Sequence, residues 1–343
     1  MKTLFLILLL LFPLSVSAQE KILNLYIWAG EIPDQIIQQF AKETGIKVNF
    51  STYENNEIMY AKLRATKKSD YDLIMPSSYF VDRMRNQNML EKIDPSKIPN
   101  WKNINLEFTH LAYDPENKYS IPFIWGITGI FVNQNYYPPN TINKWTDLWD
   151  KRFKNQLVLL DDVREVFSIA LLAMGYSVND QNPMHLKAAF IKLKELIKNI
   201  KAFSTDTVIS IMIDEDATIG AAWNGDVFKA SQENTNVTFN FPKEGFVIWV
   251  DNFAIPRTAS HKDAAYAFIN FILRAEIAKT IALQTTYATA NIAAQKILPP
   301  EIRNNAMIYP SQKTLRHGQI QTNLDDTTLA ILGKYWEEIK MGG

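Results

Sequence analysis

The stretch KILNLYIWAGEIPDQIIQQFAKETGIKVNFST, residues 21–52, decides the fold, because it predicts a strand, a helix and a second strand in succession. An apolar run covers residues 21–28, and alternating apolar residues over 47–52 are typical of a half-buried strand. A helix is expected over 33–44, where a proline suits the first turn and Gly45 suits the C-terminal cap. Such a unit is typical of α/β proteins with mostly parallel sheets.

The same alternation continues outward from this unit to the end of the chain. Strands are predicted over residues 72–76, 156–160, 219–223 and 246–250, and helices over 57–65, 80–86, 163–174, 186–200, 261–283 and 327–340. In the strand over 47–52, Val48 and Phe50 are expected to face the core. At roughly 150 residues per domain, the 343 residues correspond to about two domains. Since no Gly/Ser-rich linker separates them, we expect two packed α/β lobes joined by short crossing strands, an architecture that closes about a hinge.

The N-terminus predicts a secretory signal over residues 1–18. Lys2 supplies the positive charge, Leu4–Leu14 is apolar, and Val16-Ser17-Ala18 has the small-x-small form of a cleavage site. The apolar run is about half the ~20 residues that a membrane-spanning helix needs. The alternative is an uncleaved anchor. Cleavage after Ala18 predicts a mature protein in the periplasm.

Composition excludes several classes of protein. Lys and Arg number 36 and Asp and Glu number 36, so the chain lacks the basic excess of a nucleic-acid-binding protein. It contains no cysteine, which excludes disulfides, thiolate nucleophiles, Cys-ligated zinc and a thioether-linked lipid at the signal junction.

No catalytic, metal or cofactor motif is apparent either. The four histidines are far apart, and none belongs to an H-E-x-x-H motif. Nucleophile elbows and Gly-rich phosphate loops are missing from the sequence. We therefore predict that the protein is not an enzyme and binds no cofactor. The sequence does not exclude catalysis by carboxylates that only the fold brings together.

Acids and aromatic residues recur where the predicted strands end. They are Trp28; Ser77 and Tyr79; Asp161, Asp162 and Glu165; Trp223; and Trp249 with Asp251. Ligands of open α/β sheets bind outside the carboxyl ends of the strands. Each residue also has an ordinary alternative: Asp162-x-x-Glu165 matches a helix capping box, and the two later tryptophans match core residues.

Carboxylates combined with aromatic faces suit an organic cation. A carboxylate about 4 Å from an ammonium contributes on the order of 4 kcal/mol at an effective dielectric of 20, before desolvation. A Trp or Tyr face adds roughly 0.5–2 kcal/mol and each buried methylene about 0.8 kcal/mol. Because a buried ammonium needs its own counter-charge, separated carboxylates with rings between them match a linear polyamine.

At these positions the chain resembles the periplasmic spermidine/putrescine-binding proteins of ABC-type polyamine transporters, the PotD type. The resemblance is carried by residues 39–48, 51–54, 59–63, 71–79, 119–126, 161–167, 223–225, 249–251 and 254–256. It implies a type II periplasmic-binding-protein fold whose two α/β lobes close on a ligand. Lobe I is expected to hold residues 19–125 and 252–300, and lobe II residues 126–251 and 301–343.

The resemblance also implies roles for matching residues. The acids that would pair with ligand amines are Asp162, Glu165 and Asp251. The rings that would enclose the methylenes are Trp28, Tyr79, Trp223, Trp249 and Tyr287, and polar contacts are expected from Ser77, Thr205 and Gln321.

One site departs from the family pattern. After Trp28 the family typically has a hydroxyl residue and, two positions later, an aromatic one, whereas this chain has Ala29 and Glu31. We hypothesise that Glu31 lies at the cleft and adds an acidic partner for a ligand amine. In the alternative, Glu31 faces solvent at the start of the next helix.

The resemblance predicts a protein that captures spermidine or putrescine and delivers it to an inner-membrane permease. One alternative is a periplasmic polyamine sensor that reports to a membrane signalling protein, and another is an amine-converting enzyme, which the missing redox motifs disfavour. The lysines at 192, 194, 198 and 201 form a basic helix face, either a docking surface or a solvated one.

Overall fold

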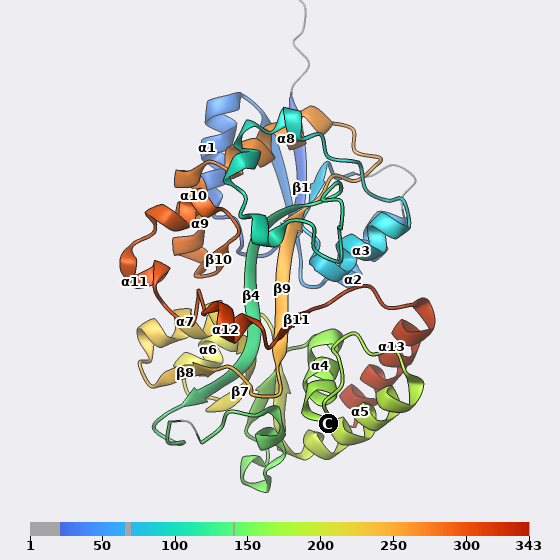
Figure 1. Cartoon of the computed structure of the whole chain (residues 1–343), viewed down its shortest axis with the longest axis vertical. Coiled ribbons are helices and arrows are strands. Elements are labelled where there is room, and N and C mark those ends of the chain that lie inside the picture. Colours follow the sequence, from blue (N-terminus) through green and yellow to red (C-terminus); the bar gives the residue numbers. More distant parts are fainter. Residues whose placement is uncertain (1–20, 66–69, 140, 343) are drawn as a thin grey trace, which may run out of the picture.

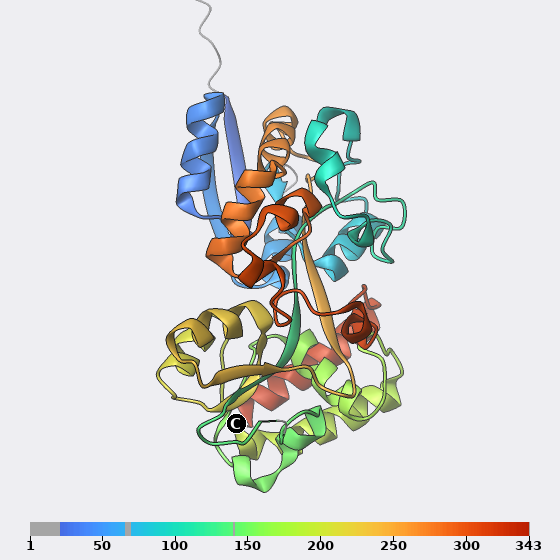
Figure 2. The same ribbon diagram turned by 60° about the vertical axis from the view of Figure 1, so that its left-hand side comes forward.

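The computed structural model describes residues 21–65, 70–139 and 141–342, so the predicted signal over 1–18 lies outside it. Two α/β lobes are stacked along the long axis of the molecule, and long strands run between them (Figures 1 and 2). We call the lobe with β1–β3 lobe I and the lobe with β5–β8 lobe II. The expected two-lobe α/β architecture is confirmed.

Lobe I is built on the unit that opens the chain. Its sheet has the order β2-β1-β3 with parallel pairing, from β1 (Ile22–Trp28), β2 (Lys47–Tyr53) and β3 (Leu73–Ile74). Its first helices are α1 (Asp34–Thr44), α2 (Asn56–Ala65) and α3 (Ser78–Asn86). Leu25 and Ile27 of β1 belong to the same core as Phe40 of α1. Gly45, with φ of 68°, ends α1 as predicted.

The prediction that Phe50 faces the core is wrong. Phe50 is 40% exposed, whereas Val48 on the same strand is half-buried. The reason is that β2 is the edge of its sheet and pairs only with β1 among the described strands.

Two crossing strands join the lobes. β4 (Ile121–Asn133) is buried along its whole length and pairs antiparallel with β9 (Phe246–Phe253) (Figure 1). The larger sheet has the order β11-β9-β4-β7-β5-β6, with β8 and β10 also pairing with β4. The expectation of mostly parallel sheets is correct for β5 with its neighbours and wrong for β4, all of whose pairings are antiparallel.

The remaining elements follow the predicted alternation, with additions. The strands are β5 (Leu157–Leu159), β6 (Ile200–Phe203), β7 (Ile219–Trp223), β8 (Val237–Asn240), β10 (Ala288–Thr289) and β11 (Gly318–Ile320). The helices are α4 (Val163–Ala173), α5 (Pro183–Leu196), α6 (Val208–Ile213), α7 (Asn224–Glu233), α8 (Lys262–Ile272), α9 (Ala275–Thr285), α10 (Ile292–Ile297), α11 (Pro300–Arg303), α12 (Gln312–Leu315) and α13 (Asp326–Met341). Within the described ranges, every helix is too short or too polar to span a bilayer.

The prediction of a single helix over 261–283 is wrong, because the helix is interrupted between α8, which ends at Ile272, and α9, which begins at Ala275. The carbonyl of Leu273 accepts hydrogen bonds from the side-chain amides of Asn103, at 2.9 Å, and Asn291, at 2.8 Å. These amides, supplied by distant segments, satisfy the carbonyl that a continuing helix would have paired.

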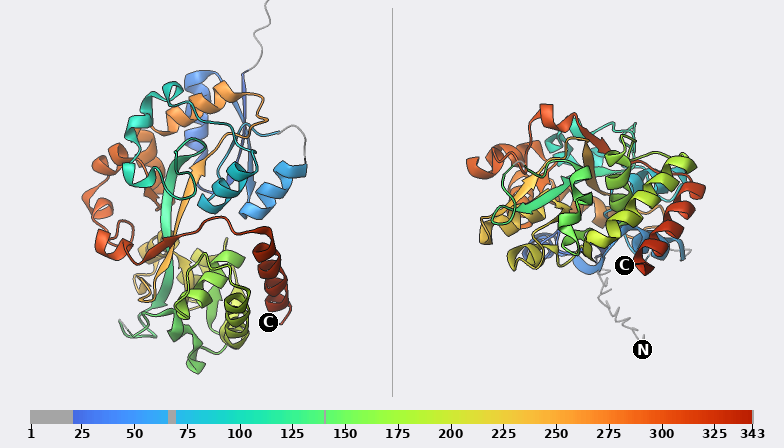
Figure 3. Two further views of the ribbon diagram at one scale, coloured as in Figure 1. Left: turned by 45° about the vertical axis from the view of Figure 1, so that its right-hand side comes forward. Right: turned by 90° about the horizontal axis from the view of Figure 1, so that it is seen from below.

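A third segment links the lobes on the side of α3. After β11 the chain runs beneath α3 before it enters α13 (Figure 3). Ser78 donates to the Gln321 carbonyl at 3.1 Å, and the Asn323 amide donates to Asp82 at 3.0 Å. Arg83 pairs with Asp326 at 2.8 Å.

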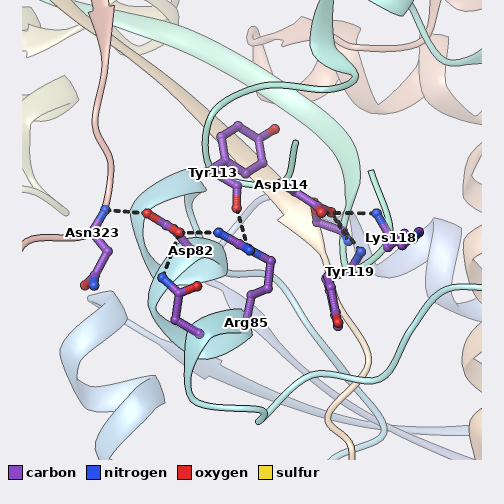
Figure 4. A network of polar contacts seen from close by, with 9 residues as sticks. Asp82, Arg85, Tyr113, Asp114, Lys118, Tyr119 and Asn323 are labelled. Atoms are coloured by element: carbon purple, nitrogen blue, oxygen red, sulfur yellow. Dashed lines mark hydrogen bonds and ion pairs between the residues drawn. The ribbon is translucent and has the colours of Figure 1, made fainter. Parts of the chain in front are cut away.

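Further polar contacts anchor α3 within lobe I. Asp82 also accepts from Arg85 at 2.7 Å, and Arg85 donates to the Tyr113 carbonyl at 3.1 Å (Figure 4). In the same loop, Asp114 accepts from the backbone amides of Lys118 and Tyr119. The network fixes α3, whose N-cap Ser77 and first-turn residue Tyr79 are predicted site residues.

Candidate ligand-binding site

A cavity of about 340 Å³ lies where the lobes meet. Side chains from both lobes and from the crossing strand β9 line it. All twelve residues predicted from the sequence are among its lining: Trp28, Glu31, Ser77, Tyr79, Asp162, Glu165, Thr205, Trp223, Trp249, Asp251, Tyr287 and Gln321. The structure thus brings them together, and their role in binding stays a prediction.

The cavity is strongly acidic. Its lining holds seven carboxyl side chains and one lysine: Glu31, Glu54, Asp162, Glu165, Asp206, Asp226, Asp251 and Lys229. The whole chain has equal numbers of acidic and basic residues, so this excess is local. Carboxylates concentrated in a concave site attract cations and repel anions.

Six aromatic side chains form much of the wall: Trp28, Tyr53, Tyr79, Trp223, Trp249 and Tyr287. The Trp249 ring packs edge-on against Trp223, with centroids 5.9 Å apart, and against Tyr287 at 5.1 Å. Trp28 contacts Tyr53 at 5.0 Å. Trp249 packs in the hydrophobic core and also lines the cavity, so the predicted roles as a core residue and as a site residue are both compatible with its position.

Two glycines make room for these rings. A Cβ on Gly126 of β4 would lie 2.2 Å from Cζ2 of Trp249, and a Cβ on Gly225 would lie 2.2 Å from Cδ1 of Tyr287. Between these glycines, Asn224 accepts from the Ile127 amide at 2.9 Å. The motif Trp223-Asn224-Gly225 therefore joins β7, β4 and the cavity wall in one packing unit.

The first acid group comprises Glu31, Asp226 and Asp251, and we call it the Asp251 group. Ser77 donates to Asp251 at 2.5 Å, and Tyr287 donates to Asp226 at 2.6 Å. The carboxyls of Glu31 and Asp251 are neighbours that change each other's pKa. Burial raises the pKa of Asp251 to about 7 and that of Asp226 to about 6.

Glu31 is the most perturbed member of this group. Burial, and then the charge of Asp251, hold the pKa of Glu31 well above its usual range. Glu31 is 9% exposed and lines the cavity. The structure therefore directs Glu31 into the cleft and not toward solvent.

The second acid group, the Glu165 group, comprises Asp162 and Glu165 at the start of α4. Asp162 caps the helix by accepting from the Glu165 amide at 3.0 Å, as the capping alternative predicts. Burial, with repulsion from Asp162, raises the pKa of Glu165 to about 8. Arg164 lies buried beside them with its guanidinium 5.1 Å from the ring centre of Tyr79, and its charge opposes this rise.

Several buried polar atoms of the lining have no hydrogen-bond partner among the described residues. They are Oε2 of Glu31, Oε2 of Glu165, and the indole nitrogens of Trp28, Trp223 and Trp249. Most buried polar atoms in proteins are paired. One free carboxyl oxygen in each acid group therefore offers an acceptor to a ligand that carries N–H donors.

The remaining predicted polar residues occupy supporting positions. Thr205 accepts from the Asp161 amide at 3.2 Å, and Gln321 donates to Ser168 at 3.3 Å. Asp161 itself does not line the cavity, because its carboxylate pairs with Lys340 at 2.8 Å.

The prediction of one basic helix face is wrong, because only Lys192 and Lys194 lie on α5, while Lys198 lies in the following 3-10 turn and Lys201 on β6. Lys192 lies 4.5 Å from the ring centre of Trp149, and Lys194 lies 5.3 Å from that of Phe190. Lys198 is exposed, and Lys201 donates to the Asp216 carbonyl.

Sequence reasoning missed several lining residues, of which Asp226 is the most important. Asp226 directly follows the Trp223-Asn224-Gly225 motif at the end of β7, and this position after a strand was a usable signal. Glu54 and Tyr53 follow the same rule at the end of β2. Within the described ranges, no cluster of three His, Asp or Glu side chains is arranged to hold a metal ion.

Comparisons with known proteins show which family the chain belongs to. The family described as bacterial extracellular solute-binding protein matches residues 35–308. The spermidine/putrescine-binding periplasmic protein of Salmonella typhimurium is 43% identical over 326 residues, covering 95% of this chain and 93% of that protein. The putrescine-binding periplasmic protein PotF of Escherichia coli is 33% identical over 348 residues, covering 96% and 94%.

A solved structure shows the same fold. The spermidine/putrescine ABC transporter substrate-binding protein PotD of Streptococcus pneumoniae has a TM-score of 0.80 and 34% identity, covering 94% of this chain and 99% of that chain. The expected type II periplasmic-binding-protein fold is thus confirmed.

Proposed function

The chain belongs to the bacterial extracellular solute-binding proteins, and we propose that its solute is a polyamine, spermidine or putrescine, held in the cavity between the lobes. Membership confirms the resemblance inferred from the sequence motifs. It makes the protein a binding component of an ABC transporter and not an enzyme.

The observation that carries the ligand assignment is the pair of acid groups with aromatic rings in one cavity. A linear polyamine has ammonium groups separated by methylenes, so its charges and its apolar segments alternate. Each ammonium paired with a carboxylate gains on the order of 4 kcal/mol at an effective dielectric of 20, before desolvation. Rings such as Trp223 and Trp249 add roughly 0.5–2 kcal/mol for an ammonium over a ring face.

We assign one end of the ligand to each acid group. Asp251, oriented by the hydroxyl of Ser77, receives one ammonium, and Glu31 adds a second acidic partner. Glu165 receives another amine through its unpartnered oxygen. The methylenes lie against the rings of the lining, and Thr205 and Gln321 add polar contacts.

Transport follows from closure of the lobes. We propose the boundaries expected from the sequence, with lobe I at 19–125 and 252–300 and lobe II at 126–251 and 301–343. A ligand that touches both lobes binds the closed arrangement better and shifts the equilibrium toward it. The closed protein then docks on an inner-membrane permease, after export to the periplasm and removal of the signal over 1–18.

Mass spectrometry of the purified native protein tests the ligand directly. The protein is denatured, and the released small molecules are compared with those from a Glu31→Gln, Asp251→Asn double variant prepared alongside. We expect spermidine or putrescine from the wild type, near one molecule per chain, and much less from the variant. Release of a neutral or anionic solute instead would refute the polyamine assignment.

A further inference from the structure

We propose that the Glu31–Asp251 pair holds one shared proton in the ligand-free protein and releases it when a ligand ammonium binds. The inference rests on the proposed function, since it concerns the same site and the same ligand class. It assigns to Glu31 a role beyond that of an added acidic partner, because it makes binding depend on pH.

The first observation is that both carboxyls are buried in the wall of one cavity, close enough for each to change the pKa of the other. Glu31 follows β1 and Asp251 lies on β9, with exposures of 9% and 4%. An ionised carboxylate only accepts hydrogen bonds, so two neighbouring carboxyls can bond to each other only when one of them carries a proton. Two like charges held together away from water cannot both ionise, and the pair titrates as a unit.

The second observation is the lack of a built-in cation beside the pair. The titratable groups that face it are Asp226 from α7, Tyr53 from β2, Tyr113 from the loop before β4 and Tyr287 after α9. Burial holds the pKa of all three phenols above their usual range, so they stay neutral and supply no charge. The lining lysine, Lys229, acts on Asp226. Within the described part of the chain, these groups leave the proton as the counter-charge of the second carboxyl.

The third observation is that Glu31 has an acceptor to spare. Its Oε2 is buried without a partner, while Asp251 is held by Ser77. A ligand ammonium at this place donates to both carboxyls and supplies the positive charge that the proton supplied before. The O–H bond of the protonated carboxyl then breaks and its proton passes to bulk solvent, while the ligand keeps all of its N–H bonds.

The consequence is an affinity that is linked to the binding of a proton. Affinity rises with pH as long as the free pair holds its proton. One linked proton changes the dissociation constant by up to about tenfold per pH unit.

Calorimetric titration in two buffers of equal pH but different ionisation enthalpy counts the protons released. Wild type, Glu31→Gln, Glu31→Tyr and the exposed control Glu233→Gln are titrated with spermidine and with putrescine at pH 7. We expect wild type and Glu233→Gln to release equal numbers of protons, and both Glu31 variants to release about one fewer. Glu31→Tyr restores the aromatic residue, so binding without the proton is measurable even if the Gln variant fails to fold.

Two results overturn the inference. One is equal proton release by wild type and the Glu31 variants, and the other is a wild-type affinity that does not change between pH 5.5 and 7.5. Failure of the wild type to bind either polyamine would refute the proposed function instead, so the two failures are distinguishable.

Discussion

The two acid groups of the cavity balance their charge in different ways. The Glu165 group lies at the N-terminus of α4 beside the buried guanidinium of Arg164, and the Asp162 carboxylate accepts the hydrogen bond that caps the helix. In the Asp251 group, Tyr287 and Lys229 act on Asp226, whereas the Glu31–Asp251 pair has the Ser77 hydroxyl and the shared proton proposed above. One end thus has a guanidinium of the protein beside it, and the Glu31–Asp251 pair depends on a proton or on a ligand.

The comparison teaches where ligand charge matters most. A helix N-terminus and an arginine favour the ionised form of the Glu165 group whether or not a ligand is present, although burial still raises the pKa of Glu165 to about 8. A ligand ammonium at the Asp251 group supplies a positive charge that no side chain of the described residues supplies to the Glu31–Asp251 pair. We therefore expect substitutions at the Asp251 end to have the larger effect on affinity.

Asp251→Asn should have the largest effect. It removes a buried carboxylate from a ligand ammonium and leaves that charge without its main partner, which costs about 3 kcal/mol, or on the order of a hundredfold in affinity. Calorimetry with spermidine and putrescine measures the loss, with the exposed Asp34→Asn as control. An affinity within threefold of the wild type would contradict the claim that the Asp251 end contributes most to binding.

Gly126→Ala should come next, because it acts on the ring wall that both ends share. The added methyl group would overlap the Trp249 ring, at 2.2 Å from Cζ2, and overpacking of this kind costs about 1–3 kcal/mol. We expect a lower melting temperature and weaker binding of both polyamines. In the control Gly333→Ala the new Cβ meets no atom within 4 Å, so its stability should not fall.

Asp162→Asn should weaken binding by about tenfold or less, because Arg164 remains and Asn caps a helix as well as Asp does. Its melting temperature should match the wild type. Asp162→Ala, which also removes the cap, should lose about 1 kcal/mol of stability in addition. A larger loss of affinity for Asp162→Asn than for Asp251→Asn would reverse the ranking of the two ends.

A separate effect, on folding and not on affinity, is expected in the thermal stability of the ligand-free protein. The folded-state pKa values of Asp226, Asp251 and Glu165, at about 6, 7 and 8, exceed those of the unfolded chain. The folded protein therefore binds more protons, and its stability falls as pH rises from about 4 through these values. Scanning calorimetry from pH 5 to 8 should show a declining melting temperature, and a saturating polyamine should reduce the decline. A rising melting temperature would show that these carboxyls are not buried as the structure has them.

Much of the site was predictable because its residues follow strands. Trp28 ends β1, Ser77 follows β3, Asp162 follows β5 and Trp223 ends β7, as the apolar runs indicated. The local caps, such as Gly45 and Asp162, could also be read from short patterns. These features depend on neighbours in the sequence, which is why the sequence determines them.

Features set by distant contacts could not be predicted. β4 has a proline and two glycines, and it is buried on both faces, so it shows no strand period. The break between α8 and α9 depends on the side chains of Asn103 and Asn291. Phe50 is exposed because of its strand's place at the sheet edge, which the residue pattern does not encode.

A crystal structure of the protein grown with spermidine tests the central claim most directly. We expect a single polyamine in the cavity between the lobes, with ammonium nitrogens within hydrogen-bond distance of Asp251 at one end and Glu165 at the other. Density for spermidine outside this cavity, or a cavity occupied with no nitrogen near either carboxylate, would contradict it.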